Sequence, residues 1–206
     1  MRTIQEAKLI AIIRLPDSAQ VAPCINSLVK GGIKVLEITS NTPSFAKEIT
    51  RAREAHPSIL IGAGTITSVA LAHEAIAAGA QFLVTPNVDQ DIITVAHQHN
   101  IPILMGAMTP SEIQRAIQFG ADAIKLFPAG SLGIDYFKSI LGPFKGTPFF
   151  AVGGIGEDNM AQWLASGIAG LGMGSKLCKP ILNASDANDV KAFAIKILAQ
   201  INEHSH

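Results

Sequence analysis

The chain has 206 residues, of which 48% are hydrophobic and 16% are charged, a composition typical of a compact globular protein rather than a disordered one. Its 16 lysine and arginine residues balance 16 acidic residues and are scattered along the chain, which argues against a nucleic-acid-binding or membrane-binding surface. The length suits one folding unit, so we expect a single domain over residues 1–206.

The chain carries no sign of export or membrane insertion. No apolar run approaches the roughly 20 residues that cross a membrane, and the first residues lack the apolar core of a signal peptide. We therefore expect a cytoplasmic protein. Cys24 and Cys178 lie far apart in sequence, and in a reducing compartment we expect both to be free thiols.

Eight apolar runs alternate with amphipathic segments along the chain, and each run is apolar almost throughout, as in parallel strands that are buried on both faces. The predicted strands are Leu9–Arg14, Val35–Thr39, Leu60–Thr65, Phe82–Pro86, Ile103–Met108, Ala123–Pro128, Phe149–Gly154 and Gly170–Leu177. The predicted helices are Ala19–Lys30, Phe45–Ala55, Ser68–Ala78, Asp91–His99, Ser111–Phe119, Glu157–Ser166 and Asn188–Asn202.

This alternation predicts a single-domain α/β fold, a closed (β/α)8 TIM barrel. A doubly wound open sheet is the alternative fold, and the lack of a strand–GxGxxG–helix start makes it the weaker one. In a barrel of this kind, functional groups lie at the carboxyl ends of the strands.

Arg14 closes the first predicted strand. An arginine at the mouth of a barrel can hold a carboxylate through two parallel hydrogen bonds. A solvated strand end without a function is the other interpretation of this residue.

Glu37 lies inside the second predicted strand. Alternation along the strand places Glu37 on the same face as Val35, toward the barrel interior, because the larger apolar side chains at Leu36 and Ile38 pack outward under the helices. A carboxylate in that position requires a partner or a chemical task.

Lys125 occupies the middle of the sixth predicted strand and is the natural partner of Glu37. By the same alternation it faces inward with Ala123 and Phe127. Burial lowers the pKa of an amine, and a neutral lysine is a nucleophile for carbonyl groups. A structural lysine, either reaching solvent from the strand edge or held in a buried ion pair, remains the alternative.

Glycine pairs mark several strand ends. Gly62 and Gly64 in the third strand suggest that a ligand or another backbone approaches closely. Gly153-Gly154 at the end of strand seven and Gly174-Ser175 in strand eight favour an anion cradle, a site at which barrels commonly bind phosphate. Two tight turns are the alternative explanation.

The spacing of the histidines does not indicate a metal site. None of the six lies in a predicted strand, and no group has the spacing of metal ligands. We expect no metal and no cofactor, so a carbonyl reaction here would use a lysine Schiff base as its electron sink.

Four motifs together resemble a known family, the KDPG/KHG aldolases. They are Leu36-Glu37-Ile38-Thr39, Gly62-Ala63-Gly64-Thr65, Lys125-Leu126-Phe127-Pro128 and Val152-Gly153-Gly154-Ile155, and they occur in the order and spacing of that family. The resemblance runs from about Lys8 to Lys179. It implies a class I aldolase that acts on 2-keto-3-deoxy-6-phosphogluconate or a relative, built as a homotrimer of metal-independent (β/α)8 barrels.

The resemblance also implies a role for individual residues. Lys125 would form the Schiff base and Glu37 would be the general acid and base. The pyruvate pocket would be lined by Thr65, Pro86 and Phe127, and the substrate phosphate would be held by Gly153, Gly154, Gly174 and Ser175.

Two departures from the family pattern bear on the substrate. Asn41 stands where many members have an arginine that helps to hold the substrate carboxylate, which makes Arg14 the obvious replacement. Ala151-Val152 stands where many members have Pro-Thr before the paired glycines, so Val152 would contact the substrate differently near its C4 hydroxyl. Both departures resemble the branch that acts on the C4 epimer, 2-keto-3-deoxy-6-phosphogalactonate, whereas 139–144 is more similar to the phosphogluconate branch.

We therefore expect retro-aldol cleavage of a phosphorylated 2-keto-3-deoxy sugar acid to pyruvate and D-glyceraldehyde 3-phosphate, with the C4 epimer left open. Unphosphorylated 4-hydroxy-2-oxoglutarate, which would give pyruvate and glyoxylate, is a further candidate substrate. A phosphosugar epimerase or isomerase on the same barrel, without a covalent intermediate, is the alternative enzyme. A non-catalytic binding barrel is the third possibility, and the inward pairing of Glu37 with Lys125 argues against it.

Overall fold

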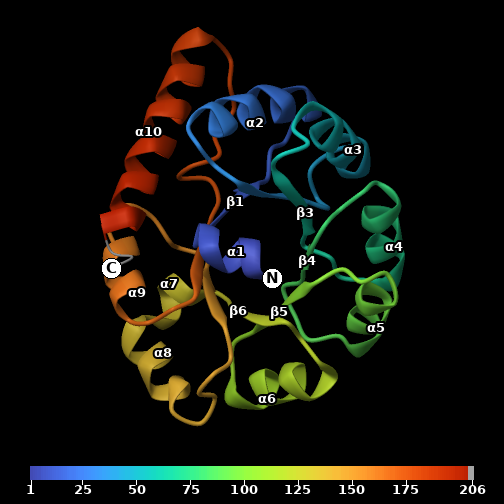
Figure 1. The fold of residues 1–206 in the computed structure, drawn as a ribbon, viewed down its shortest axis with the longest axis vertical. Helices are drawn as coiled ribbons and strands as arrows, with labels where there is room; N and C mark the ends of the chain where they lie inside the picture. Colours follow the sequence, from blue (N-terminus) through green and yellow to red (C-terminus); the bar gives the residue numbers. More distant parts are fainter. Residues whose placement is uncertain (204–206) are drawn as a thin grey trace.

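The computed structural model describes residues 1–203, so His204 and His206 lie outside the described part of the chain. Eight parallel strands pair in sequence order, and β1 pairs with β8 to close the barrel (Figure 1). The strands are β1 (Leu9–Ile13), β2 (Val35–Thr39), β3 (Leu60–Gly64), β4 (Leu83–Val84), β5 (Ile103–Ala107), β6 (Ala123–Leu126), β7 (Phe149–Val152) and β8 (Gly170–Met173). The predicted (β/α)8 barrel is thus confirmed, and the open sheet is excluded.

Helices form an outer ring around the strands (Figure 1). They are α2 (Val21–Lys30), α3 (Phe45–Ala55), α4 (Val69–Ala77), α5 (Gln90–Gln98), α6 (Pro110–Phe119), α7 (Ala129–Leu132), α8 (Ile134–Leu141), α9 (Met160–Ala165) and α10 (Ala184–Glu203). A short 3₁₀ turn, η1 (Ser18–Gln20), precedes α2, and α1 (Arg2–Ala7) precedes the first strand.

Three helices were absent from the sequence-based prediction: α1, α7 and α8. The signal for α8 was present, because Ile134, Phe137 and Ile140 recur every three residues along it, and Phe137 and Ile140 are buried. The shorter α1 and α7 span six and four residues, too few to show a helical period.

Several strands end earlier than predicted. Thr65, Gly153 and Gly154 have φ angles of 57°, 88° and 75°, which take the chain out of the extended conformation directly after β3 and β7. Gly174 and Ser175 also lie beyond β8, because the Gly174 carbonyl accepts the backbone N–H of Leu177 at 2.8 Å and turns the chain. These groups therefore belong to loops at the barrel mouth and not to the strands themselves.

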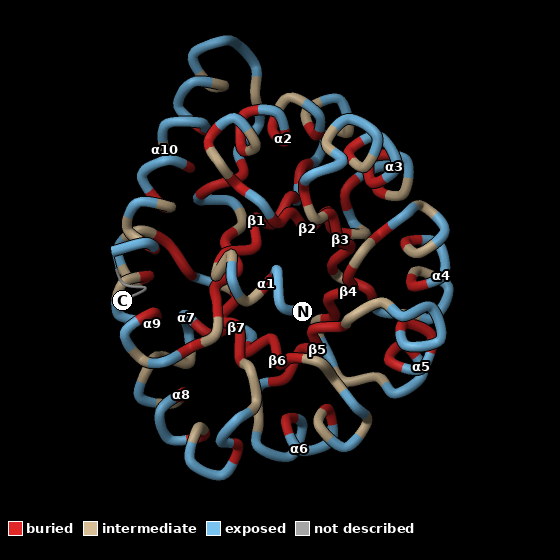
Figure 2. The backbone as a smooth tube through the Cα atoms, in the orientation of Figure 1, coloured by how far each residue is buried: buried red, intermediate tan, exposed pale blue. Residues whose placement is uncertain are grey.

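The buried residues form two layers, visible as the continuous buried ring of strands and the buried inner faces of the helices in Figure 2. The layer inside the barrel comprises Ile4, Ile10, Ile12, Val35, Phe82, Val84, Leu104, Ala123, Phe150 and Val152. Ile4 comes from α1, which lies across the centre of the ring in Figure 1 and closes the amino end of the barrel. The other layer packs the outward side chains of the strands, such as Leu36 and Ile38, against the helices.

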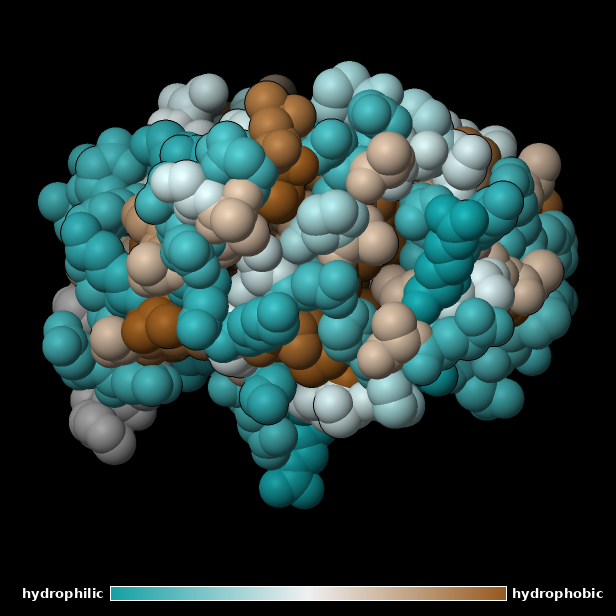
Figure 3. All heavy atoms as spheres, turned by 90° about the horizontal axis from the view of Figure 1, so that it is seen from above, coloured by the Kyte–Doolittle hydropathy of each residue, from teal (hydrophilic) through white to brown (hydrophobic). Residues whose placement is uncertain are grey.

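The face that Figure 3 views is mainly hydrophilic, and apolar side chains appear on it only as separate patches. Within residues 1–203 no helix combines the length and the apolar character needed to cross a membrane. Cys24 in α2 and Cys178 after β8 are both buried and free, and their thiols are neighbours despite their distance in sequence. Burial raises the pKa of the Cys178 thiol, and the nearby Cys24 thiol raises it further.

Candidate active site

A cavity of about 210 Å³ opens at the carboxyl ends of the strands, between β1, β2, β6, β7 and β8. Nine of the residues predicted from the sequence line it: Arg14, Glu37, Lys125, Phe127, Val152, Gly153, Gly154, Gly174 and Ser175. Because Ile4 and the interior layer fill the opposite end of the barrel, this mouth is where the inward polar groups meet solvent.

Lys125 lies at the centre of β6, between Gly106 of β5 and Phe150 of β7 in the strand register. Its side chain is only 3% exposed, and its Nζ lies 4.9 Å from the centre of the Phe127 ring. Burial lowers the pKa of the Lys125 amine; the nearby Glu37 carboxylate opposes that shift, and the charge of Arg14 adds to it. The neutral form of this amine is therefore more accessible than in a lysine exposed to water.

Glu37 is 1% exposed in β2, and its Oε1 has no hydrogen-bond partner among the described residues. Burial raises the pKa of this carboxyl group, while the charges of Lys125 and Arg14 oppose the shift. The carboxylate lies against Gly64 of β3, where a methyl group would overlap its Oε1. The sequence suggested the close approach of a ligand or another backbone at Gly64; the group that approaches it is the Glu37 side chain.

Arg14 lies just beyond β1 and is exposed at the mouth. Its Nη2 donates a hydrogen bond to Oγ1 of Thr65 at 3.2 Å, which orients the guanidinium group from the end of β3, on the far side of β2. The charge of Arg14 acts on both buried groups, lowering the pKa of Lys125 and that of Glu37. Thr65 itself does not line the cavity; it contacts the site only indirectly, through its hydrogen bond with Arg14.

The loops after β7 and β8 form the second part of the site. Gly153 and Gly154 follow β7 with positive φ angles, a conformation that side chains disfavour, and both face the cavity. Gly174 and Ser175 line the cavity from the loop after β8. These loops can offer backbone N–H groups and a hydroxyl to an anion, in the manner of known anion-binding turns.

Two residues discussed from the sequence lie elsewhere. Pro86 does not line the cavity, and its backbone packs against Gly106 of β5, where a methyl group would overlap it. Asn41 is exposed beyond β2 and is also absent from the cavity lining, which leaves Arg14 as the arginine at this mouth.

Four further residues line the cavity and were not identified from the sequence: Ile12, Ile155, Gly172 and Lys176. Ile12 could have been found, because alternation from Ile10 points it inward. Lys176 directly follows the predicted Ser175, but an exposed lysine in a loop has no signal of its own in the sequence. Within residues 1–203, no three His, Cys, Asp or Glu side chains gather in a way that could hold a metal ion.

The arrangement is suited to covalent chemistry on a carbonyl compound. A lysine with a lowered pKa can supply a nucleophile, and a carboxyl group in the same cavity, whose pKa burial raises, can serve as a general acid and base. Perturbed groups paired in a cleft are characteristic of functional sites.

Comparisons with known proteins agree with this geometry. A family model described as KDPG and KHG aldolase matches residues 1–193. The 2-dehydro-3-deoxy-phosphogluconate aldolase of Treponema pallidum (strain Nichols) is 34% identical over 163 residues, which cover 79% of this chain and 78% of the relative. The 2-dehydro-3-deoxy-6-phosphogalactonate aldolase of Escherichia coli (strain K12) is 34% identical over 173 residues, which cover 82% of this chain and 83% of the relative.

Solved structures show the same likeness. The KDPG aldolase of Legionella pneumophila, in a crystal structure with pyruvate captured at low pH as a covalent carbinolamine intermediate, superposes with a TM-score of 0.83. It is 27% identical, and the match covers 92% of this chain and 93% of that one.

The burial of Lys125 and Glu37 predicts a gain in stability when both are replaced. The double variant E37Q/K125M should raise the free energy of unfolding by about 1–4 kcal/mol at pH 7, because two desolvated ionisable groups become groups that cannot ionise. Urea denaturation measures the effect as a higher midpoint at an unchanged slope.

The control is an ion pair on the surface, Glu157 with Lys196, whose Oε1 and Nζ atoms are 2.6 Å apart and whose side chains are 39% and 57% exposed. The corresponding variant E157Q/K196M should change stability by no more than about 0.5 kcal/mol. A less stable E37Q/K125M variant would show that the buried pair stabilises the barrel.

Proposed function

The chain belongs to the KDPG and KHG aldolase family and is a class I aldolase, and we propose that Lys125 forms its Schiff base and that Glu37 is its general acid and base. The substrates are a phosphorylated 2-keto-3-deoxy sugar acid and pyruvate. The observation that carries the residue assignment is the burial of an amine and a carboxyl group in one cavity, at 3% and 1% exposure.

The reaction begins at C2 of the substrate. Neutral Lys125 attacks the ketone carbon, and the resulting carbinolamine loses water to give a protonated imine. Glu37 takes the proton of the C4 hydroxyl group as the C4 oxygen becomes the aldehyde carbonyl. The electron pair of the C3–C4 bond forms the C2=C3 double bond of an enamine, and the π electrons of the protonated imine move to its nitrogen. D-glyceraldehyde 3-phosphate leaves, and an enamine of pyruvate remains on Lys125.

The second half of the reaction restores the enzyme. Glu37 returns its proton to C3 of the enamine, which regenerates the protonated imine. Water then hydrolyses the imine, releasing pyruvate and the free amine. Both steps need a carboxyl group whose two protonation states are accessible near neutral pH, and the raised pKa of Glu37 supports this assignment.

Arg14 and the mouth loops position the substrate in this proposal. Arg14 holds the substrate carboxylate with its free N–H groups, while Thr65 keeps the guanidinium group in place. Gly153, Gly154, Gly174 and Ser175 hold the phosphate. The ring of Phe127 covers the reacting amine, and Val152 contacts the region of C4; Pro86 supports the pocket from behind Gly106.

We also propose a cytoplasmic homotrimer with a single domain per chain. Met108 and Phe127, at the neighbouring ends of β5 and β6, leave 42% and 37% of their surface exposed, an apolar area that a second copy would cover. The neighbouring free thiols of Cys24 and Cys178 suit a reducing compartment.

The covalent step has a direct test. Incubation with pyruvate followed by borohydride reduction should attach one pyruvyl group to Lys125, detected by the mass of the intact protein and of its peptides, and K125A should remain unmodified. E37Q should still form the adduct but should turn over about 10²–10⁴ times more slowly, because proton transfer is impaired. Turnover of the sugar acid without any trapped adduct would instead support the non-covalent isomerase-like chemistry.

Arg14 allows a test of both binding and pKa. Its charge lowers the pKa of Lys125, so R14M should raise that pKa, and the pH at which imine formation reaches half its maximum should move upward. R14M should also raise KM for pyruvate. R14K keeps the charge but loses the paired hydrogen bonds, so it should raise KM and leave the pH profile unchanged. An unchanged pH profile in R14M would show that the charge of Arg14 does not influence the pKa of Lys125.

The stereochemistry at C4 is tested at Val152. A coupled assay for pyruvate, run on both C4 epimers, should show that V152T shifts the ratio of kcat/KM toward the gluconate epimer by about fivefold, the effect of one added hydrogen bond. Adduct formation with pyruvate, which has no C4, should be unchanged. An equal change for both epimers would contradict the placement of Val152 near C4.

A further inference from the structure

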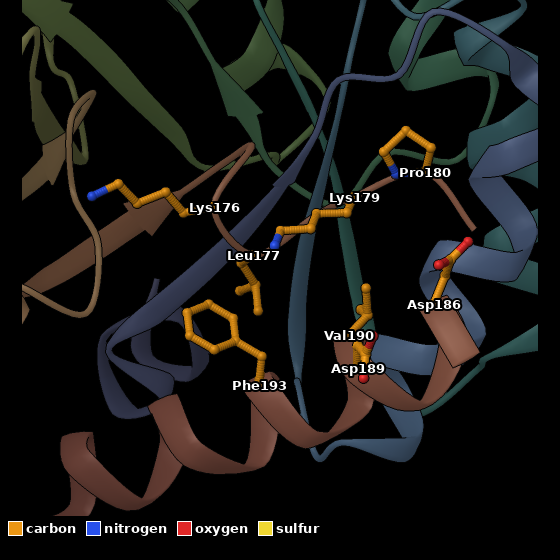
Figure 4. Close-up of a pocket in the computed structure, with 8 residues that line it drawn as sticks. All are labelled: Lys176, Leu177, Lys179, Pro180, Asp186, Asp189, Val190 and Phe193. Atoms are coloured by element: carbon orange, nitrogen blue, oxygen red, sulfur yellow. The ribbon is translucent and has the colours of Figure 1, made fainter. Parts of the chain in front are cut away.

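Lys176 lies at the border of the site cavity, in the loop after β8 and directly after Ser175. It lines the cavity together with Gly153, Gly154 and Ser175. It also lines a neighbouring hollow of about 230 Å³ between this loop and α10, where its side chain points away from the other labelled side chains (Figure 4). Lys176 therefore separates the cavity from the surface groove beside it.

An ion pair holds the Lys176 side chain in this position. Its Nζ lies 2.8 Å from Oδ1 of Asp158, in the loop after β7, and the side chain crosses Gly156, where a methyl group would overlap it. The Lys176 ammonium group keeps the pKa of the Asp158 carboxyl below its usual range. The pair thus bridges the two loops that form the anion cradle.

This ion pair is easily exchanged. The side chains of Lys176 and Asp158 are 50% and 71% exposed, and solvent-exposed pairs of this kind contribute little to stability. A lysine on a flexible four-carbon stem can turn from a carboxylate to a phosphate dianion, which carries up to twice the charge.

The cations of the cavity have separate tasks. In the described part of the chain three cationic side chains line it, namely Arg14, Lys125 and Lys176. Lys125 is the proposed nucleophile, and Arg14 is tied to Thr65 beside the proposed carboxylate position. The cradle of Gly153, Gly154, Gly174 and Ser175 has hydrogen-bond donors but no positive charge of its own. Of these three cations, Lys176 is the one that lies in the loop of Gly174 and Ser175.

We propose that Lys176 leaves Asp158 to bind the distal phosphate of the substrate, and that this exchange determines the preference of the enzyme for phosphorylated over unphosphorylated keto acids. Asp158 competes with the phosphate for the ammonium group and holds the lysine beside the cradle until the phosphate binds. This inference rests on the proposed function and adds a specificity-determining residue to the site.

Three variants test the exchange. K176M should raise KM for the phosphorylated substrate about tenfold, the loss of one charge-assisted hydrogen bond, whereas adduct formation with pyruvate, which has no phosphate, should not show this loss. D158N should act in the opposite direction and lower KM severalfold, because the ammonium group loses its competitor. The double variant D158N/K176M should match K176M, since Asp158 acts only through Lys176.

Lys179 supplies the matched control. It leaves the same loop, lines the neighbouring hollow and is exposed, but it does not line the site cavity. K179M removes the same charge three residues away and should leave KM unchanged. An equal rise of KM in K179M would reduce the effect to general electrostatic attraction, and a D158N effect that persists in the double variant would also overturn the proposal.

A binding measurement separates this inference from the proposed reaction. Titration calorimetry of the full chain with glycerol 3-phosphate, which carries the phosphate but no ketone, should give a Kd about tenfold weaker for K176M than for the unmodified enzyme or K179M. If pyruvate leaves no adduct on Lys125 while this difference persists, the covalent reaction fails and the phosphate site stands. If the adduct forms and the Kd is unchanged in K176M, the role of Lys176 is refuted.

Discussion

Lys125 and Glu37 are almost completely removed from water, and an apolar interior accommodates neither of them easily in its charged form. The same burial shifts the pKa of the amine downward and that of the carboxyl group upward, so the two groups approach a common range in which a proton can pass between them and a substrate. The site depends on this desolvation. The apolar layer beneath it, and Ile4 at the closed end, keep water out of the barrel interior below the two groups.

In the closed barrel, the two buried ionisable groups lie on strands, and the glycine-rich groups at the mouth lie on loops. Strands β2 and β6 fix the proposed reacting groups, Glu37 and Lys125, because the strand register determines the depth and the direction of their side chains. The groups that we propose to recognise the substrate lie just past the strand ends, where Gly153 and Gly154 line the cavity with positive φ angles. Substitutions in the loops can therefore change the proposed substrate contacts without disturbing the buried pair. Val152 is the last residue of β7, and Lys176 lies in the loop after β8.

The sequence was sufficient for those features that follow from periodicity. Alternation placed Glu37 and Lys125 inside the barrel, and the repeated strand–helix pattern predicted the closed fold, which the structure confirms. Several predicted strands extended beyond the ends that the structure shows. The turn at Gly174, for example, depends on backbone hydrogen bonds, which leave no apolar pattern in the sequence. Other features depend on the tertiary fold, which brings together segments that are distant in sequence and therefore leaves no local sequence signal. They are the contact of Arg14 with Thr65, the neighbouring thiols of Cys24 and Cys178, and the position of Lys176.

The closure of the amino end by α1 has a kinetic consequence. Because Ile4 seals that end, substrate and both products pass through the one open mouth. The proposed phosphate cradle lies at the border of this mouth, and Lys125 lies deeper inside. In the proposed reaction the fragment at the border is free once the carbon–carbon bond breaks, whereas the deeper fragment is still covalently attached. Product release is then ordered: the aldehyde departs first, and its exit admits the water that hydrolyses the imine. In the synthetic direction the order reverses, so pyruvate must be loaded before the aldehyde arrives.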